Sequence, residues 1–283
     1  MENTFTLMPM SQQINLTPGE SYTGYITIVN PVDATEDFSY KVSISPYSVI
    51  GENYTADLQT VSGRNEITKW ITISEPTGTV KPNESKKVEF TINTPSNAPG
   101  GGQYAALAVS SNPANTDSDG VAVKNIFEMA SLIYANVAGD IKRGGEILEN
   151  NVPGFVAVTP IQVTAMFENT GNIHEVATII LKVSNFFTGE VILPTEEDDG
   201  QFSEIVMPES TYFASRDISN LPALGVVKVN QTIYYNGSSS VSERDVIICP
   251  IWFLLLVIAV FASIIVFIIS RIKIHKKRRS ATL

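Results

Sequence analysis

Apolar and polar residues alternate along most of the N-terminal 245 residues. In the stretch SKKVEFTINTP, Val88 and Phe90 lie between polar neighbours, and residues 38–46 and 160–169 follow the same rule. Residues 121–137 also keep their apolar side chains on one parity. A period of two places one face of a β-strand in a core and the other in solvent. The pattern therefore predicts sheets with one buried face.

Turn-forming residues separate these runs. Pro-Gly, Thr-Gly-Asn and Asn-Gly sequences occur between them, and strands that arrive every 8–12 residues with such turns are typical of β-sandwiches. Before residue 246 no stretch carries the apolar stripe of a helix. We therefore predict an all-β protein, with two tandem immunoglobulin-like β-sandwiches followed by a single transmembrane helix.

Composition sets the expected boundaries. The segment DIKRGGEILENNVPGF is rich in glycine and polar residues and lacks strong alternation, so it separates the two sandwiches. We expect a first sandwich over residues 1–139 and a second over residues 140–236. The polar residues 237–245 then form a flexible stalk, which leads to a transmembrane helix over residues 246–270 and a basic tail over residues 271–283.

The run from Val246 to Ser270, which includes Trp252, is 25 residues long and contains no charged residue. About 20 apolar residues suffice for a helix to cross a bilayer. Basic residues are retained in the cytoplasm, so we expect the tail inside the cell and the sandwiches outside. These basic residues are Arg271, Lys273, Lys276, Lys277, Arg278 and Arg279. A tail-anchored protein with a cytosolic body is the less favoured alternative, because these cations would then have to cross the membrane.

Export to the outside requires a signal peptide, and the first 13 residues, MENTFTLMPMSQQ, contain neither a basic segment nor a long apolar run. We therefore expect the sequence to begin after its natural start. Residues 1–245 hold 13 basic against 29 acidic residues, a net charge of −16, which disfavours nucleic acid as a partner. The one cysteine, Cys249, lies in the apolar run, so no disulfide and no cysteine metal site is expected in the outer region. No cofactor is expected either.

Three consecutive glycines, Gly100, Gly101 and Gly102, precede the apolar run QYAALAV. A phosphate-binding loop requires a following Lys-Ser/Thr and a helix, and here Gln103 and a strand follow. A structural loop between two strands, which lets another backbone approach closely, is therefore the favoured interpretation. A ligand-binding surface near this loop is the alternative, with aromatic contacts from Tyr104, Tyr47 and Tyr54.

Other candidate sites are weaker. Asn115–Gly120 opens like a calcium loop, but Ile126 occupies the position of the bidentate glutamate, so a solvated turn is expected. The acidic run of residues 196–199 is typical of a solvated loop. His174 lies in the turn TGNIHE with no motif around it and is expected at the surface. No catalytic signature appears, so we expect no enzyme activity.

The first region resembles the N-terminal domain of the WxL-interacting protein family of bacterial surfaces. The resemblance is carried by FTLMPMSQQINLTPGESYTGYITIVNP, SPYSVIGENYTAD and the pair VKPNESKKVEFTINTP and GGGQYAALAV. The stretch TPIQVTAMFENTGNIHEVATIILKVSNFFTGEVI resembles the second domain of that family, and the membrane helix with its basic tail matches its architecture. The resemblance implies peptidoglycan binding by the first domain and protein partners, such as WxL-domain proteins, for the second.

These observations favour a membrane-anchored cell-surface binding or scaffold protein that engages cell-wall glycan, surface proteins or both. Two other classes stay open. A chaperone-like assembly factor would accept a partner β-strand at an uncharged, exposed sheet edge. An enzyme with a site assembled from dispersed residues would show a deep pocket with convergent polar groups.

Overall fold

The computed structural model describes residues 5–111 and 128–279, with side chains described up to residue 270. The calcium-like stretch Asn115–Gly120, part of the alternating run at 121–127, and the side chains of the basic tail lie outside the described residues. The chain forms two compact units. The first contains Met1–Glu146 together with the turn regions Phe167–Val176 and Ile205–Tyr212, and the second contains the remainder.

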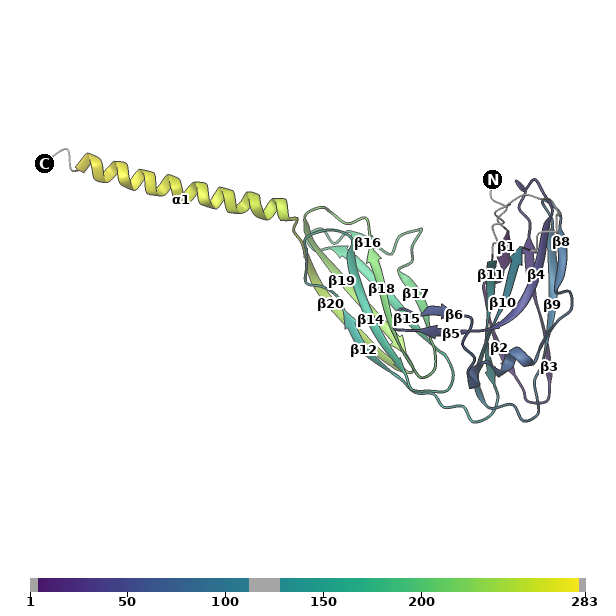
Figure 1. Ribbon diagram of the computed structural model, residues 1–283. Helices are drawn as coiled ribbons and strands as arrows, with labels where there is room; N and C mark the ends of the chain where they lie inside the picture. The colour runs from purple at the N-terminus through teal and green to yellow at the C-terminus, as the bar shows by residue number, and fades with distance from the viewer. Residues whose placement is uncertain (1–4, 112–127, 280–283) are drawn as a thin grey trace. The chain divides into compact units, whose positions relative to one another are not determined.

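The first unit is a sandwich of two sheets (Figure 1). Its four-stranded sheet runs in the order β1 (Thr6–Met8), β3 (Ser21–Val29), β9 (Ser85–Asn93) and β7 (Ile71–Ile73). Its five-stranded sheet runs in the order β2 (Ser11–Leu16), β11 (Glu128–Val137), β10 (Gly101–Ser111), β4 (Phe38–Pro46) and β8 (Thr77–Val80). The predicted alternation is confirmed in β9, where Val88, Phe90 and Ile92 are buried in the core between the sheets.

Two further elements of the first unit belong to neither sheet. The hairpin of β5 (Ser48–Ile50) and β6 (Thr55–Asp57) is a separate two-stranded sheet. The 3-10 helix η1 (Gly63–Lys69), which the sequence pattern does not predict, begins at Ser62, whose hydroxyl accepts the amide N–H of Arg64. The side chain of Asn65 in turn accepts the amide N–H of Ser62. Two backbone N–H groups at the start of the helix, those of Ser62 and Arg64, are thus hydrogen-bonded by side chains of the helix start itself.

The second unit is also a sandwich. Its smaller sheet runs in the order β12 (Glu146–Asn151), β14 (Ile161–Asn169) and β18 (Ser210–Ile218). Its larger sheet runs in the order β13 (Phe155–Val156), β20 (Ser238–Ile248), β19 (Gly225–Tyr235), β15 (Glu175–Asn185) and β16 (Val191–Leu193), with β17 (Gln201–Val206) also paired to β15. In each unit, two sheets pack face to face around an apolar core of their own, which is the architecture of immunoglobulin-like folds. The sequence predicts this fold.

The expected stalk is a strand instead. Residues 238–245 form most of β20, which pairs with β19 in unbroken antiparallel register from Ser238 opposite Tyr235 to Ile248 opposite Gly225. The turn at Asn236-Gly237 has positive φ at both residues, which is the geometry of a tight hairpin. Val246, predicted to start the membrane helix, is a buried core residue of this strand.

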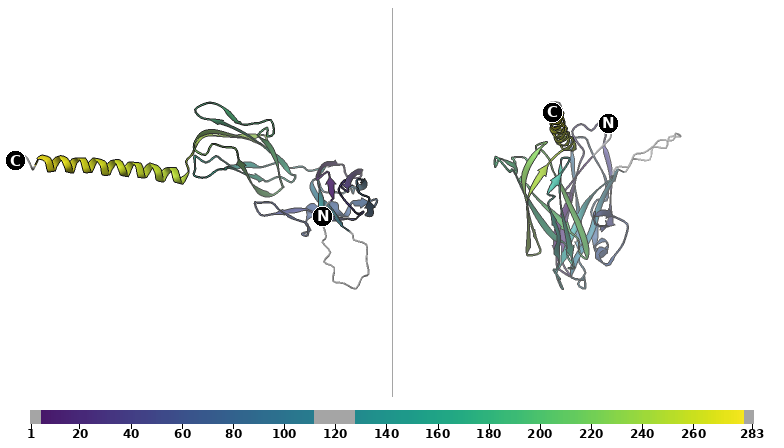
Figure 2. Two further views of the ribbon diagram at one scale, coloured as in Figure 1. Left: turned by 90° about the horizontal axis from the view of Figure 1, so that it is seen from above. Right: turned by 90° about the vertical axis from the view of Figure 1, so that its left-hand side faces the viewer.

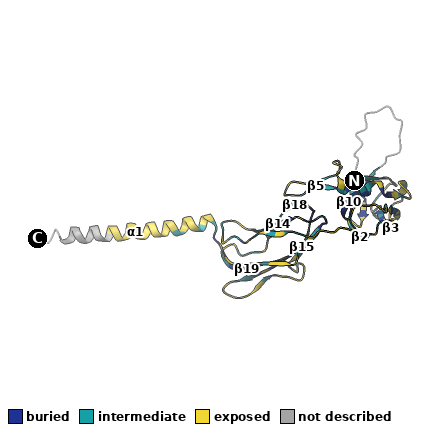
Figure 3. Ribbon diagram, turned by 90° about the horizontal axis from the view of Figure 1, so that it is seen from below, coloured by how far each residue is buried: buried dark blue, intermediate teal, exposed yellow. Residues whose placement is uncertain are grey.

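The helix α1 (Ile251–Arg279) starts five residues later than predicted and is one uninterrupted helix (Figure 2). Its segment Ile251–Ser270 is long and apolar enough to cross a membrane, and it is exposed rather than packed against the protein (Figure 3). This exposure argues against a core helix, because a core helix would be covered on most sides.

Candidate functional site

The glycine triplet lies at the start of strand β10, where the backbones of residues 139–140 and 172 pack closely against it. A Cβ atom on Gly100 would lie 2.6 Å from the backbone nitrogen of Asp140, and Gly101 has a φ of +116°. The amide N–H of Gly102 donates to the carbonyl of Asn172 at 2.8 Å. The structural interpretation of the triplet is therefore supported, although Gly101 and Gly102 already belong to the strand rather than to the loop before it.

The tyrosines proposed for ligand contact do not present free rings. Tyr104 is 1% exposed and Tyr47 is 7% exposed, and both belong to a cluster on the outer face of the five-stranded sheet. Tyr54 is half-buried at the edge of this cluster, where its hydroxyl accepts the amide N–H of Met207 and bonds Ser210. The sequence could not reveal this burial, because the residues that cover this face are distant along the chain.

Strand β10 is buried on both faces from Gly101 to Val109. The small apolar side chains of AALAV suit this position, since a continuous apolar run is typical of a strand that is covered on both sides. Odd-numbered side chains such as Leu107 enter the sandwich core, whereas Tyr104 and Ala106 point into the outer cluster with Tyr134 and Met207. The first unit therefore has a second apolar layer outside its sandwich.

Polar groups within the outer layer are paired with one another. The backbone N–H of His174 donates to the hydroxyl of Tyr104 at 2.9 Å, and that hydroxyl lies 3.4 Å from Nδ1 of the same histidine. The hydroxyl of Tyr134 donates to that of Tyr47 at 3.2 Å. His174, expected at the surface, is thus a buried residue.

Burial determines the charge state of this cluster. Burial, with a smaller contribution from the Arg143 cation, lowers the pKa of His174 to about 4. Burial also raises the pKa values of Tyr104 and Tyr134 above the ordinary tyrosine value. All three groups are therefore neutral at pH 7, and this second layer carries no buried charge at these residues.

The helix η1 is fixed to β10 through two buried amide side chains. Nδ2 of Asn65 donates to the carbonyls of Tyr47 and Tyr104, at 2.8 and 3.0 Å. The side chain of Gln103 accepts the N–H of Ile67 and donates to the carbonyl of Gly63. These bonds satisfy buried polar groups that would otherwise destabilise the layer.

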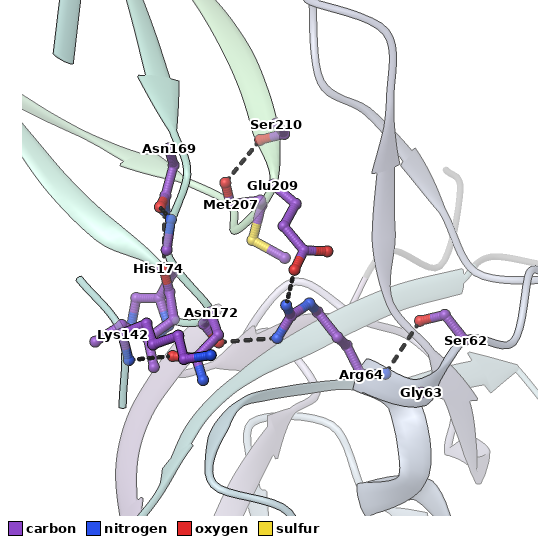
Figure 4. Close-up of polar contacts among 12 residues, drawn as sticks. Ser62, Gly63, Arg64, Lys142, Asn169, Asn172, His174, Met207, Glu209 and Ser210 are labelled. Carbon is purple, nitrogen blue, oxygen red and sulfur yellow. Dashed lines mark hydrogen bonds and ion pairs between the residues drawn. The ribbon is translucent and has the colours of Figure 1, made fainter. Parts of the chain in front are cut away.

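Arg64 and Asn172 join the turn regions of the first unit to its sandwich (Figure 4). Nη1 of Arg64 donates to the carbonyl of Asn172 at 2.8 Å, and Nη2 forms an ion pair with Glu209 at 2.6 Å. The side chain of Asn172 accepts the N–H of Lys142 and donates to the carbonyl of Asp140, both at 2.7 Å. The sequence does not identify either residue as a contact residue: the turn signal Thr-Gly-Asn marks Asn172 as a turn residue but does not reveal its partners.

One part of the five-stranded sheet has an open edge. Strand β2 pairs with β11 only from Leu132 onwards, where the N–H of Leu132 donates to the carbonyl of Met10 at 2.9 Å. Among the described residues, no strand pairs with Glu128–Ser131 on the side away from β10. Backbone groups of alternate residues face alternate edges, so those of Glu128 and Ala130 point outward, as those of Leu132 do.

Apolar side chains lie next to this open edge. Met8 and Met10, at the crossing from β1 to β2, are 49% and 54% exposed. The intervening Pro9 accepts a hydrogen bond from the hydroxyl of Ser131 at 2.7 Å, which holds the crossing against the C-terminal end of this segment. We name Glu128–Ser131 together with Met8 and Met10 the β11 edge.

The described residues do not form a metal site. Within residues 5–111 and 128–279, no group of three or more His, Cys, Asp or Glu side chains could hold a metal ion. Cys249 is a free, buried thiol between β20 and α1.

No protein-family model matches the chain, and no curated protein matches it either. Among solved structures, it is similar to the class 5 fimbriae chaperone CfaA, with 13% identity, a TM-score of 0.41 and coverage of 85% of this chain and 99% of that one. It is also similar to the E. coli chaperone DraB, with 12% identity, a TM-score of 0.39 and coverage of 86% and 97%.

A chain of the CsuC–CsuE chaperone–tip adhesion subunit complex of Acinetobacter baumannii gives 14% identity, a TM-score of 0.39 and coverage of 85% and 98%. At these identities and TM-scores, what those proteins bind says nothing about what this chain binds.

Proposed function

We propose that this protein is a membrane-anchored assembly or binding protein without enzymatic activity, and that its β11 edge accepts an extended segment of a partner protein. The observation that carries the proposal is the segment Glu128–Ala130 of β11 at the side of a five-stranded sheet: no described strand pairs with its outer edge, and it has no charge after Glu128. A partner strand added there would form main-chain hydrogen bonds with the outward groups of Glu128 and Ala130. Met8 and Met10 would supply adaptable apolar contacts beside it.

Two other sheet edges, β8 and the free part of β20, carry features that discourage pairing. Strand β8 is flanked by Pro76 and by Lys81-Pro82. On β20, the segment that β13 leaves unpaired carries Glu243, Arg244 and Asp245. Charges and prolines at sheet edges oppose the addition of a further strand. Between Met129 and Ser131 the β11 edge has neither a charge nor a proline, which favours it over β8 and β20 as the place for a partner strand.

The resemblance to the WxL-interacting family supplies the proposed identity of the partner, a WxL-domain surface protein. The same resemblance suggests wall glycan as a ligand of the first unit. The burial of Tyr104 and Tyr47 leaves that suggestion without an aromatic surface at the glycine triplet. A protein segment is therefore the partner that we favour.

In the proposed topology, α1 spans the cell membrane, both units lie outside the cell and the basic tail is cytoplasmic. The six basic residues at 271–279 support this orientation, because positive charge is retained on the cytoplasmic side. Protease added to intact cells should remove an epitope placed before Phe5 and leave one placed after Leu283. Protection of the first epitope with loss of the second would reverse the orientation.

The edge is tested by replacing Glu128 with the photo-reactive residue benzoylphenylalanine in the full chain, produced together with a WxL-domain protein. We expect a crosslinked product that is retained in Ala130→Ser and lost in Ala130→Pro. Proline removes the outward N–H of residue 130 but no bond to β10, whereas serine keeps that N–H.

The same photo-reactive residue at Thr79, on the edge strand β8, is the matched control and should give no product. A product that survives Ala130→Pro, while the variant retains the tryptophan fluorescence of the folded chain, would contradict strand addition. A product at Thr79 alone would move the partner to the other edge of the sheet.

A further inference from the structure

The end of the second unit from which α1 starts has an apolar surface. Four chain segments meet there: residues 157–160, 186–190, 219–224 and 247–250. Phe155 pairs with Ile247, and Ile247 also pairs with Val226, whose carbonyl accepts the N–H of Phe186 at 3.0 Å. A shallow pocket at this end is lined by the residues Ala157, Val158, Thr159, Ala223, Ile248, Pro250, Ile251 and Trp252.

Large apolar side chains protrude from this end. Phe187 is 76% exposed and Val158 is 73% exposed, and Phe155, Phe186, Leu224 and Ile247 are also exposed. The four segments contain a single charged residue, Glu190. An exposed apolar patch of this kind on a soluble surface usually marks an interaction site.

The turn that carries the two phenylalanines is ordered by its own hydrogen bonds. The side chain of Asn185 accepts the N–H groups of Phe187 and Thr188, at 2.9 and 3.1 Å. The rings of Phe186 and Phe187 meet edge to face with centroids 5.2 Å apart. The turn therefore presents Phe187 outward in a defined geometry instead of folding it onto the sheet.

Charged residues begin two positions further along β19 and β20. On the outer face, Val226 lies opposite Ile247, and the next outward pair is Lys228 opposite Asp245, followed by Asn230 opposite Glu243. The surface thus changes from apolar to charged within two residues along β19 and β20. Such a boundary fits a protein end in contact with the interfacial region of a bilayer, with its charges in water.

The connection to α1 is short. Strand β20 ends at Ile248 and α1 begins at Ile251, so the three chain steps between them span at most about 11 Å. The connecting residue Cys249 is tied to β13, because its N–H donates to the carbonyl of Val156 at 3.0 Å. If α1 crosses a membrane, this end of the unit is held next to the lipid surface whatever angle the helix adopts.

We infer that the loops at this end, with Phe187 and Val158 at their tips, insert into the lipid interface of the membrane that α1 spans. The inference rests on the proposed membrane anchorage. Trp252, at the start of α1, is exposed and occupies the place of the aromatic residues that mark membrane interfaces. Insertion would hold the second unit on the lipid surface and restrict its motion about the two-residue connection.

The test uses the full chain in phosphatidylcholine vesicles, with Cys249→Ala removing the only native cysteine. The environment-sensitive fluorophore NBD is attached to a single cysteine at one of three positions. Thr188 reports the Phe-Phe turn, Ser239 is an exposed control at the opposite end of β20, and Ala259 reports α1. Thr188→Cys keeps both phenylalanines in place.

We expect the label at residue 188 to emit at shorter wavelength than the label at 239. It should be quenched by lipids that carry a nitroxide near the headgroup and protected from aqueous iodide. Phe187→Ser should shift the 188 signal toward that of residue 239 and leave the label at 259 unchanged. Because Phe187 is mostly exposed, this substitution does not disturb the core.

The possible failures are distinguishable. A label at 259 that iodide quenches would contradict the membrane anchor itself. A label at 259 in lipid, with residue 188 as open to iodide as residue 239, would overturn only the insertion of the loops. Protection of residue 188 from iodide without quenching by nitroxide lipids would mean that protein, rather than lipid, covers the turn, and would also overturn the inference.

Discussion

The outer face of the five-stranded sheet in the first unit is buried, whereas the outer face of the six-stranded sheet in the second unit is open to solvent along much of its length. Strand β10 is buried at every position from Gly101 to Val109. Strand β19 alternates, with Val227 and Val229 in the core and Lys228 and Tyr234 exposed. Both strands are central in their sheets, so position in the sheet does not explain the difference.

The two sheets differ in what lies on their outer faces. In the first unit, η1 bonds to β10 through Asn65 and Gln103, and the outer cluster includes Met207. In the second unit, the face of β19 and β20 carries the exposed pair Lys228–Glu243. The covered face of the first unit combines small apolar residues on β10 with buried amide side chains that fix its cover. Four measurements test whether the two sheet faces differ in this way.

The largest effect is expected inside the sandwich core, the layer that the two units share. Phe90→Ala should destabilise the first unit by about 3–5 kcal/mol, because it removes a fully buried ring and leaves a cavity. The side chain of Trp70 belongs to the same core, so denaturant unfolding followed by its fluorescence, in Trp252→Phe detergent-solubilised full chain, reports this unit.

Tyr25→Ala is the matched control for Phe90→Ala. Tyr25 lies one register position from Phe90, on the opposite face of the same sheet, where it is exposed beneath the ammonium group of Lys87. We expect a loss of about 1 kcal/mol or less, the range of an exposed cation–π contact. Equal losses for the two variants would show that Phe90 does not occupy a core position.

The second expected effect is the pH dependence of the covered face. The pKa of His174 is about 4 in the folded protein against 6.5 as its ordinary value, so between these values the unfolded chain binds more protons. Stability should therefore fall as the pH drops from 6.5 to about 4, by about 3 kcal/mol for this group, and be independent of His174 above 6.5. The measurement is the unfolding free energy of the first unit at a series of pH values.

Carboxylates also titrate in the lower part of this range, so the comparison with His174→Gln isolates the histidine. This variant should lose the pH-dependent part that the histidine contributes and keep the remainder. Parallel pH profiles for the two proteins would mean that His174 is accessible to water, and that the outer layer of the first unit is open.

The sequence predicts the sandwiches well because their cores follow from local alternation. The buried set Val88, Phe90 and Ile92 can be read from the stretch SKKVEFTINTP alone. The strand that replaces the expected stalk does have a signal in the sequence. Asn236-Gly237 is a hairpin sequence, and Ser-rich residues after it can form an edge strand, because pairing with β19 requires only backbone groups.

The outer layer could not be predicted, since its contacts join residues that are distant in the sequence. Arg64 and Asn172 are 108 positions apart, and Tyr104 and His174 are 70 apart. No periodicity links such pairs. The run AALAV does indicate a strand that is buried on both faces, but it does not say what covers the second face.

The third expected effect tests one hydrogen bond of that outer layer. Tyr104→Phe removes the hydroxyl that accepts the backbone N–H of His174 and leaves this buried donor without its partner. We expect a loss of about 1–3 kcal/mol in the Trp70 unfolding experiment. Tyr234→Phe, on the exposed face of β19, is the matched control and should change stability by less than about 0.5 kcal/mol. A neutral Tyr104→Phe variant would show that the hydroxyl contributes no net stability.

The smallest effect is expected on the open face of the second unit. Lys228 and Glu243 form an ion pair at 3.4 Å with about half of each side chain exposed, so solvent and salt screen their attraction. A double-mutant cycle of Lys228→Ser and Glu243→Ser should give a coupling energy of about 0.2–1 kcal/mol that shrinks at high salt. Hydrogen exchange of peptides covering β19, in the full chain, measures the stability of this unit directly. A coupling above 2 kcal/mol that resists salt would mean that this face is desolvated in the full chain, and the contrast between the two sheets would then disappear.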